Sequence, residues 1–240
     1  MKTTLIILPG WGGNKETWKE FVALASKDFE VQVIDLPCFG EEPCPNTAWG
    51  VEDYVQFVKS KVESYQVDKP VLLGHSFGGQ IATVFASKYP EMINRLILSA
   101  PAVFRPKKGL KRLIFGAGAK PGKLIFKIPW IEKSSAWAER IYHQAIGAQD
   151  YHDTSGIKRE IFKKIIRQDR GEEASKITTP TLIVWGTLDG YLPVSNAYKL
   201  NKLIKDSQLE IVKGGRHGLH LQMPEKLLGI IRNFTVCFHL

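Results

Sequence analysis

The sequence has few cysteines, no long apolar run and no repeats, and each absence excludes a class of protein. Only Cys38, Cys44 and Cys237 occur in 240 residues, an odd set that is a poor disulfide framework and matches no strong metal-binding spacing. No uncharged apolar run approaches the roughly 20 residues of a membrane-spanning helix, and the run at residues 5–8 is too short for a signal peptide. We therefore expect a cytoplasmic protein with reduced thiols, no bound metal and no cofactor.

The composition is that of a globular domain. Hydrophobic residues make up 44% and charged residues 24% of the chain, close to the averages of globular proteins. These values exclude disorder, collagen and coiled coil as descriptions of the whole chain. Basic residues exceed acidic ones, 33 against 24, which gives a net charge of +9. A length of 240 residues suits one domain with room for a small insertion.

Six short apolar runs, bounded by Gly, Pro or Asp, predict strands. They are Thr4–Leu8, Val31–Leu36, Pro70–Leu73, Leu96–Ser99, Thr181–Trp185 and Leu209–Val212. Apolar residues follow one another in these runs without alternation, as in strands buried on both faces of a parallel sheet. Helical stretches lie between them, at Trp18–Ser26, Val51–Tyr65, Gly79–Lys88, Ser195–Ile204 and Glu225–Phe234. The alternation predicts an α/β fold with a doubly wound, mainly parallel sheet of about six strands.

One interval, from about Val103 to Ser175, contains no clear strand. A connection of this length far exceeds an ordinary crossover, and residues 157–167 have the period of an amphipathic helix. We therefore predict a helical cap, residues 103–175, inserted into a core formed by residues 1–102 and 176–240. The excess of positive charge concentrates within 103–133, where Glu132 is the only acidic residue.

The segment Gly74-His75-Ser76-Phe77-Gly78 lies between a predicted strand and a predicted helix. It has the pattern of a nucleophile elbow, in which a sharp, strained turn exposes the central hydroxyl group. Side chains two residues before and after the nucleophile would collide with the neighbouring strand and helix, which explains the glycines. The following helix directs backbone N–H groups toward developing negative charge. The pattern predicts Ser76 as a nucleophile.

With this elbow the chain resembles the α/β-hydrolase family over essentially its whole length, in the manner of a capped serine carboxylesterase. Leu8–Gly13 resembles the oxyanion loop of the family, with Pro9 where His is common. The resemblance implies that the backbone N–H groups of Trp11 and Phe77 form the oxyanion hole. Asp35–Gly40 resembles the family's Asp-x-Pro-Gly-x-Gly loop, with Cys38 in place of a glycine. We interpret its aspartate as a loop anchor and its cysteine as an idle thiol.

The resemblance also implies a base and an acid for the serine, which is a weak nucleophile without them. Trp185–Pro193 resembles the family's Trp-Gly-x-x-Asp-x-x-x-Pro and makes Asp189 the acid. Gly214–Gly218 resembles Gly-x-x-His and makes His217 the base, with His220 as a rival. The resemblance to the family's eight-stranded sheet leads us to expect six strands without the opening hairpin, in the order 2-1-3-4-5-6.

Five aromatic residues, four in the cap and one before a core helix, are candidates for the substrate pocket. They would equally well fasten the cap to the body. They are Trp49, Phe104, Phe126, Trp130 and Trp137. The positive charge of the cap indicates one of two roles. The cap either makes weak contact with anionic lipid or an acidic carrier protein, or it is simply a solvated face. No nucleic-acid-binding module is recognisable, so we expect no nucleic-acid partner. A monomer and a homodimer are both consistent with the sequence.

The function predicted is hydrolysis of small-molecule carboxylic esters with small to medium acyl chains, through an acyl-enzyme on Ser76. The same triad would serve a carbon–carbon bond hydrolase of meta-cleavage products, an enol-lactonase or an acyltransferase. A ligand receptor with a hydrolase fold is the non-enzymatic alternative. The complete set of Ser76, Asp189 and His217 favours an enzyme.

Overall fold

The computed structural model of the protein describes residues 2–104 and 156–236. Most of the predicted cap lies outside these residues, and so do three of the candidate pocket residues, Phe126, Trp130 and Trp137. Among the helices of the described residues, none has both the length and the apolar content required to cross a membrane.

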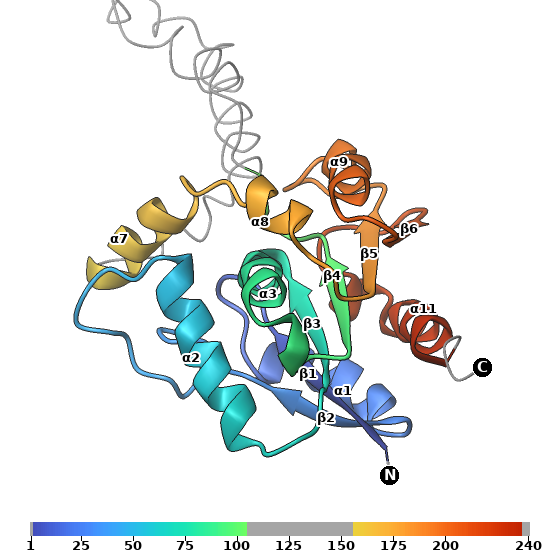
Figure 1. Cartoon of the computed structure of the whole chain (residues 1–240), viewed down its shortest axis with the longest axis horizontal. Coiled ribbons are helices and arrows are strands. Elements are labelled where there is room, and N and C mark those ends of the chain that lie inside the picture. Colours follow the sequence, from blue (N-terminus) through green and yellow to red (C-terminus); the bar gives the residue numbers. More distant parts are fainter. Residues whose placement is uncertain (1, 105–155, 237–240) are drawn as a thin grey trace, which may run out of the picture.

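Six parallel strands form one sheet, as the apolar runs predict (Figure 1). The strands lie in the order β2-β1-β3-β4-β5-β6, which confirms the predicted order. They are β1 (Thr3–Leu8), β2 (Phe29–Val33), β3 (Val71–His75), β4 (Arg95–Ser99), β5 (Thr181–Gly186) and β6 (Gln208–Val212). Strands β3, β4 and β5 are buried along their whole length, whereas the edge strands β2 and β6 are partly exposed. Burial on both faces therefore explains the continuous apolar runs.

Helices cover both faces of the sheet (Figure 1). On one face α2 (Val51–Ser64) and α3 (Ser76–Lys88) bury an apolar cluster, and on the other face α1 (Lys19–Ala25) and α11 (Pro224–Val236) bury a second one. The remaining described helices are α7 (Gly156–Ile165), α8 (Gly171–Ser175), α9 (Ser195–Leu203), α10 (Leu219–Gln222) and the 3-10 turns Glu16–Trp18 and Pro90–Met92. These two layers hold the ends of the strands in a fixed arrangement.

Most element boundaries agree with those predicted to within two residues, and two elements differ by three residues at one end. The strand expected at Val31–Leu36 is β2, Phe29–Val33. The backbone N–H of Ile34 still donates to the Ile7 carbonyl oxygen of β1 at 3.0 Å, whereas Leu36 is buried in the core beyond the end of the strand. Burial is what makes a run apolar, and burial does not require a place in the sheet. The helix expected from Gly79 begins earlier, at Ser76. The predicted turn residue and the start of the helix are thus the same residue.

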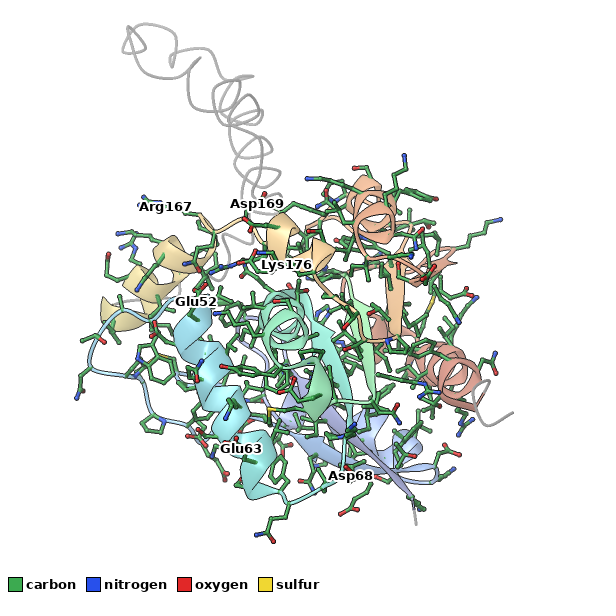
Figure 2. The ribbon with its side chains drawn as sticks, viewed as in Figure 1. Glu52, Glu63, Asp68, Arg167, Asp169 and Lys176 are labelled. Carbon is green, nitrogen blue, oxygen red and sulfur yellow. A yellow bond between two sulfur atoms is a disulfide. The ribbon has the colours of Figure 1, made fainter. Side chains whose placement is uncertain are left out.

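The described end of the predicted cap range is fastened to the core helices. The backbone N–H of Val51 donates a hydrogen bond to Gln168 Oε1 at 3.1 Å, and Gln80 Nε2 donates to the carbonyl oxygen of Gln168 at 3.1 Å. Arg170 forms two hydrogen bonds of 2.7 Å with the carboxylate of Glu52, which lies at the end of α2 nearest α7 (Figure 2). These contacts hold the segment after α7 against α2 and α3.

The prediction of reduced, unpaired thiols at Cys38 and Cys44 is wrong, because these two residues form a disulfide. Their Cα atoms lie 4.1 Å apart. The chain between them folds back on itself, with Cys38 at φ +78° and Gly40 at φ +58°. The backbone N–H of Cys38 also donates to the carbonyl oxygens of Glu42 and Pro43. A turn of this shape brings together two cysteines whose spacing has no recognisable signature in sequence.

Candidate active site

Ser76 stands at a strained turn between β3 and α3. Its φ is +51°, in the left-handed region that residues with a side chain rarely adopt, and its side chain is partly exposed. The flanking glycines make this turn feasible. A Cβ at Gly78 would lie 2.1 Å from the carbonyl oxygen of Leu8, and one at Gly74 would lie 2.6 Å from that of Gly78. Only glycine fits at either position, so the local sequence builds the predicted elbow.

Asp189 and His217 form a direct pair at the ends of β5 and β6. Asp189 Oδ2 lies 2.8 Å from His217 Nδ1, and the side chain of the aspartate is fully buried. Its other oxygen accepts the backbone N–H groups of Tyr191 and Leu192, at 2.8 and 2.9 Å. A carboxylate can only accept here, so Nδ1 of the imidazole carries the proton. In the neutral form of this imidazole, Nε2 is then the nitrogen without a proton, as a general base requires.

His75 connects this pair to the elbow. Its ring lies 4.8 Å from the ring of His217, centroid to centroid, and its backbone joins Ser76 directly. The serine and the histidine therefore belong to one corner of the molecule. In the described part of the chain no hydrogen bond joins Ser76 Oγ to His217. Such hydrogen bonds are often long in unliganded enzymes and tighten when substrate binds.

The loop after β1 lies against Ser76, as an oxyanion loop would. A Cβ at Gly10 would come within 3.3 Å of Ser76 Cβ and 3.2 Å of His75 Cδ2. The loop closes through a hydrogen bond of 3.0 Å from the Gly13 N–H to the Gly10 carbonyl oxygen. Phe77, in the first turn of α3, has a backbone N–H of the kind that finds no partner inside a helix. This arrangement brings the loop that carries Trp11 close to the start of α3.

His75 is a buried imidazole that sequence reasoning did not assign, and His220 is buried beside it, with ring centroids 4.9 Å apart. His75 Nδ1 donates a hydrogen bond of 3.0 Å to the Ser99 carbonyl oxygen, and burial, followed by the charges of His217 and His220, holds the pKa of His75 well below its usual value. Burial, followed by the charge of His217, lowers the pKa of His220 to about 4. Both rings are therefore neutral near pH 7. The only available signal for His75 was its position inside a buried strand.

The rival base His220 is placed differently from His217. Its ring stacks on Trp18, with centroids 3.9 Å apart and an interplanar angle of 6°. It is 5% exposed, and the hydrogen bond to Asp189 belongs to His217. The packing therefore favours His217 as the base.

Two of the candidate pocket residues, Trp49 and Phe104, lie in the described chain. Trp49 packs against Tyr54 and Phe57, and the Phe104 ring lies 3.7 Å from the ammonium group of Lys199. Their contacts fit the interpretation that they fasten elements together.

Other rings surround Trp11 instead. Its ring centroid lies 4.9 Å from that of Phe39, 5.7 Å from that of Phe77 and 4.9 Å from that of Phe162 on α7. These rings come from four separate segments, so the sequence carries no signal that groups them. They form an apolar wall beside the elbow.

Asp35 anchors a loop, in agreement with its interpretation from sequence. Its Oδ1 accepts the backbone N–H of Lys15 at 2.8 Å, and its Oδ2 accepts that of Glu41 at 3.2 Å. Within residues 2–104 and 156–236, no group of three His, Cys, Asp or Glu side chains is arranged to hold a metal ion.

Comparisons with known proteins show the family of the chain. Residues 1–223 match the Hydrolase_4 family, described as serine aminopeptidase, S33. The chain is 26% identical to the human monoacylglycerol lipase ABHD6 over 260 residues, which cover 99% of this chain and 77% of the lipase.

Solved structures share the fold. A putative lipase from Acinetobacter baumannii has a TM-score of 0.72 at 22% identity, with 98% of this chain and 84% of the lipase covered. A mutant of the meta-cleavage product hydrolase CumD has a TM-score of 0.70 at 19% identity, with 98% and 91% covered.

Proposed function

The chain belongs to the Hydrolase_4 family of α/β-hydrolases, and we propose that it is a serine hydrolase that cleaves carboxylic esters of small to medium acyl chain. The observation that carries this proposal is the buried carboxylate of Asp189 on Nδ1 of His217, at 2.8 Å, beside a strained elbow that exposes Ser76. An imidazole oriented by a buried carboxylate is the base that a serine nucleophile needs.

The mechanism follows from the atoms at this corner. His217 Nε2 takes the proton of Ser76 Oγ as this oxygen attacks the ester carbonyl carbon. The backbone N–H groups of Trp11 and Phe77 stabilise the oxyanion that forms, and one such donor contributes roughly 3–4 kcal/mol to lowering the barrier. The imidazolium then protonates the departing alcohol. Water, activated by the same histidine, finally releases the acid from Ser76.

The kind of substrate is supported by the apolar wall and by one relative. The rings of Trp11, Phe39 and Phe162 lie beside the proposed oxyanion loop, where the acyl group of a bound ester would meet apolar surface. The human relative is named as a monoacylglycerol lipase, which is an ester hydrolase. Carbon–carbon bond hydrolysis, lactone opening and acyl transfer would use the same three side chains and are outcomes of the test.

The test is hydrolysis of p-nitrophenyl acetate, butyrate and octanoate by wild type and by Ser76→Ala. We expect saturable turnover by wild type and a loss of at least about 1,000-fold in kcat for the variant, because the nucleophile is removed. Ser87→Ala, a partly buried serine near the far end of the same helix, is the matched control and should keep full activity.

Two results would contradict the proposal. One is unchanged turnover in a folded Ser76→Ala variant. The other is turnover of a dienoate ring-fission product at a kcat/KM far above that of every ester, which would favour carbon–carbon bond hydrolysis. Saturable binding of an ester without product would favour a receptor.

A further inference from the structure

The disulfide closes a short loop, residues 38–44, that packs against the proposed oxyanion loop. Phe39, next to Cys38, is 4% exposed and lies edge-on to Trp11 at a centroid distance of 4.9 Å. The ammonium group of Lys158 also stands 4.4 Å from the Phe39 ring centroid. The aromatic ring next to the disulfide therefore supports the residue whose N–H we assign to the oxyanion.

A second set of contacts links residues 38–44 to the segment that follows the oxyanion loop. The Asp35 carboxylate accepts the backbone N–H of Glu41 at 3.2 Å and that of Lys15, two residues after Gly13, at 2.8 Å. Gly40 packs directly onto this carboxylate, since a Cβ there would lie 2.2 Å from Asp35 Oδ2. A shift of residues 38–44 thus reaches the oxyanion loop through Asp35 as well as through Phe39.

The backbone at Cys38 is one that the disulfide helps to hold. Its φ of +78° is in the region that non-glycine residues avoid, and such a conformation persists only where the surroundings enforce it. Without the covalent bond, residues 38–44 gain conformational freedom. The hydrogen bonds of the Cys38 N–H to Glu42 and Pro43, at 3.2 and 3.3 Å, are long and would hold the turn only in part.

The two cysteine residues differ in their exposure. Cys44 is exposed, whereas Cys38 is partly buried against the core. An external thiolate therefore reaches the Cys44 sulfur first, and Cys38 is the leaving group.

We propose that Cys38–Cys44 is a thiol–disulfide exchange site, reduced by dithiols, whose oxidised state supports the oxyanion loop. In the exchange, one sulfur of the dithiol attacks Cys44 Sγ and forms a mixed disulfide, while Cys38 leaves and is protonated. The second sulfur of the dithiol then displaces Cys44, which takes the second proton. The dithiol ends as a cyclic disulfide, having given two electrons and two protons to the cysteine pair. The effect on catalysis rests on the proposed function; the exchange does not.

The experiment uses the full chain with Cys237→Ser, so that only this pair changes state. Alkylation and mass spectrometry count the free thiols before reduction, after dithiothreitol, and after reoxidation. In each state we measure kcat and KM for p-nitrophenyl butyrate and the amide hydrogen exchange of residues 10–15. On reduction we expect kcat to fall about tenfold with KM within about twofold, because a donor is displaced and not removed. Amide exchange in residues 10–15 should become faster, and reoxidation should restore both quantities.

Two variants serve as controls. Cys38→Ser with Cys44→Ser should have the low kcat permanently and should not respond to dithiothreitol. Phe39→Leu should also have a lowered kcat in its oxidised state, and reduction should lower it further only slightly, because the ring that transmits the change is gone.

The proposal is overturned by two free thiols in protein purified in air, or by a reduced pair that leaves kcat unchanged. If wild type hydrolyses no ester, the proposed function fails, and the exchange site is then judged on amide exchange alone. Unchanged exchange in residues 10–15 after complete reduction would overturn it in that case.

Discussion

At the scale of single residues, the elbow depends on two glycines that touch backbone. A Cβ at Gly78 would lie 2.1 and 2.4 Å from the carbonyl oxygens of Leu8 and Pro9. Backbone atoms cannot turn aside as the end of a flexible side chain can, so the strand β1 itself would have to move. The same strand leads into the proposed oxyanion loop. The contact of Gly78 with the end of β1 therefore matters both for packing and for the position of the proposed oxyanion loop.

Gly78→Ala should destabilise the protein by about 3 kcal/mol or more, because it forces β1 and α3 apart. The measurement is urea unfolding followed by circular dichroism. Gly229→Ala in α11 is the control, since a Cβ there meets no atom within 4 Å; it should leave stability unchanged or raise it by up to about 1 kcal/mol. Equal stability of the two variants would contradict the packing argument.

At the scale of elements, one ion pair holds the segment between α7 and α8 to α2. Arg170 is 8% exposed and pairs with Glu52 through both carboxylate oxygens at 2.7 Å and with Glu173 at 2.6 Å. Burial raises the pKa of Glu52, but the hydrogen bond to Arg170, a backbone hydrogen bond and the charges of Arg170 and Lys88 together outweigh this effect, and the net pKa is lowered. Phe162 on the neighbouring α7 packs against Trp11. The ion pair thus helps to position part of the wall beside the site.

Glu52→Gln should lower the free energy of unfolding by about 1–2 kcal/mol. The buried guanidinium loses one of its two charged partners, while the 45% exposure of the Glu52 side chain limits the cost. Glu172→Gln is the matched control, because its pair with Lys176 is exposed on both sides and should contribute nothing measurable. Urea unfolding at pH 7 measures both. A larger loss of unfolding free energy in the control than in Glu52→Gln would contradict this prediction.

At the scale of the whole molecule, buried imidazoles couple stability to pH. His220 has a pKa of about 4 in the folded protein, whereas an unfolded histidine titrates near about 6.5. Between these two values the unfolded chain binds more protons than the folded one, so the free energy of unfolding falls as the pH falls. The lowered pKa of His75 acts in the same direction. This contribution to stability is complete above about pH 6.5 and is lost progressively below it.

Between pH 7 and pH 5, we expect the free energy of unfolding of wild type to fall by about 2 kcal/mol more than that of His220→Phe. Phenylalanine keeps an aromatic ring on Trp18 and removes the titrating group. Unfolding in urea at both pH values gives the two differences. An identical pH dependence in the variant and in wild type would show that His220 titrates normally in the folded protein.

The sequence by itself determined the type of fold, the order of the strands and the chain order of the candidate residues. Strands buried on both faces must be apolar without alternation, and so the inner strands leave readable runs. The edge strands β2 and β6 are partly exposed, but each still overlaps a predicted run. The glycines at 74 and 78 are equally readable, because steric exclusion at a sharp turn admits no other residue. Strand boundaries shifted by a few residues, since a residue such as Leu36 is buried beyond the end of its strand.

Only the tertiary structure decided which distant side chains meet. Asp189 pairs with His217 while His220 stacks on Trp18, although the two histidines lie three residues apart. The disulfide between Cys38 and Cys44 depends on a local backbone turn that no spacing rule encodes. The apolar or polar character of a residue indicates whether it is buried. A contact between two residues depends on the relative position of two segments, and packing alone sets that position.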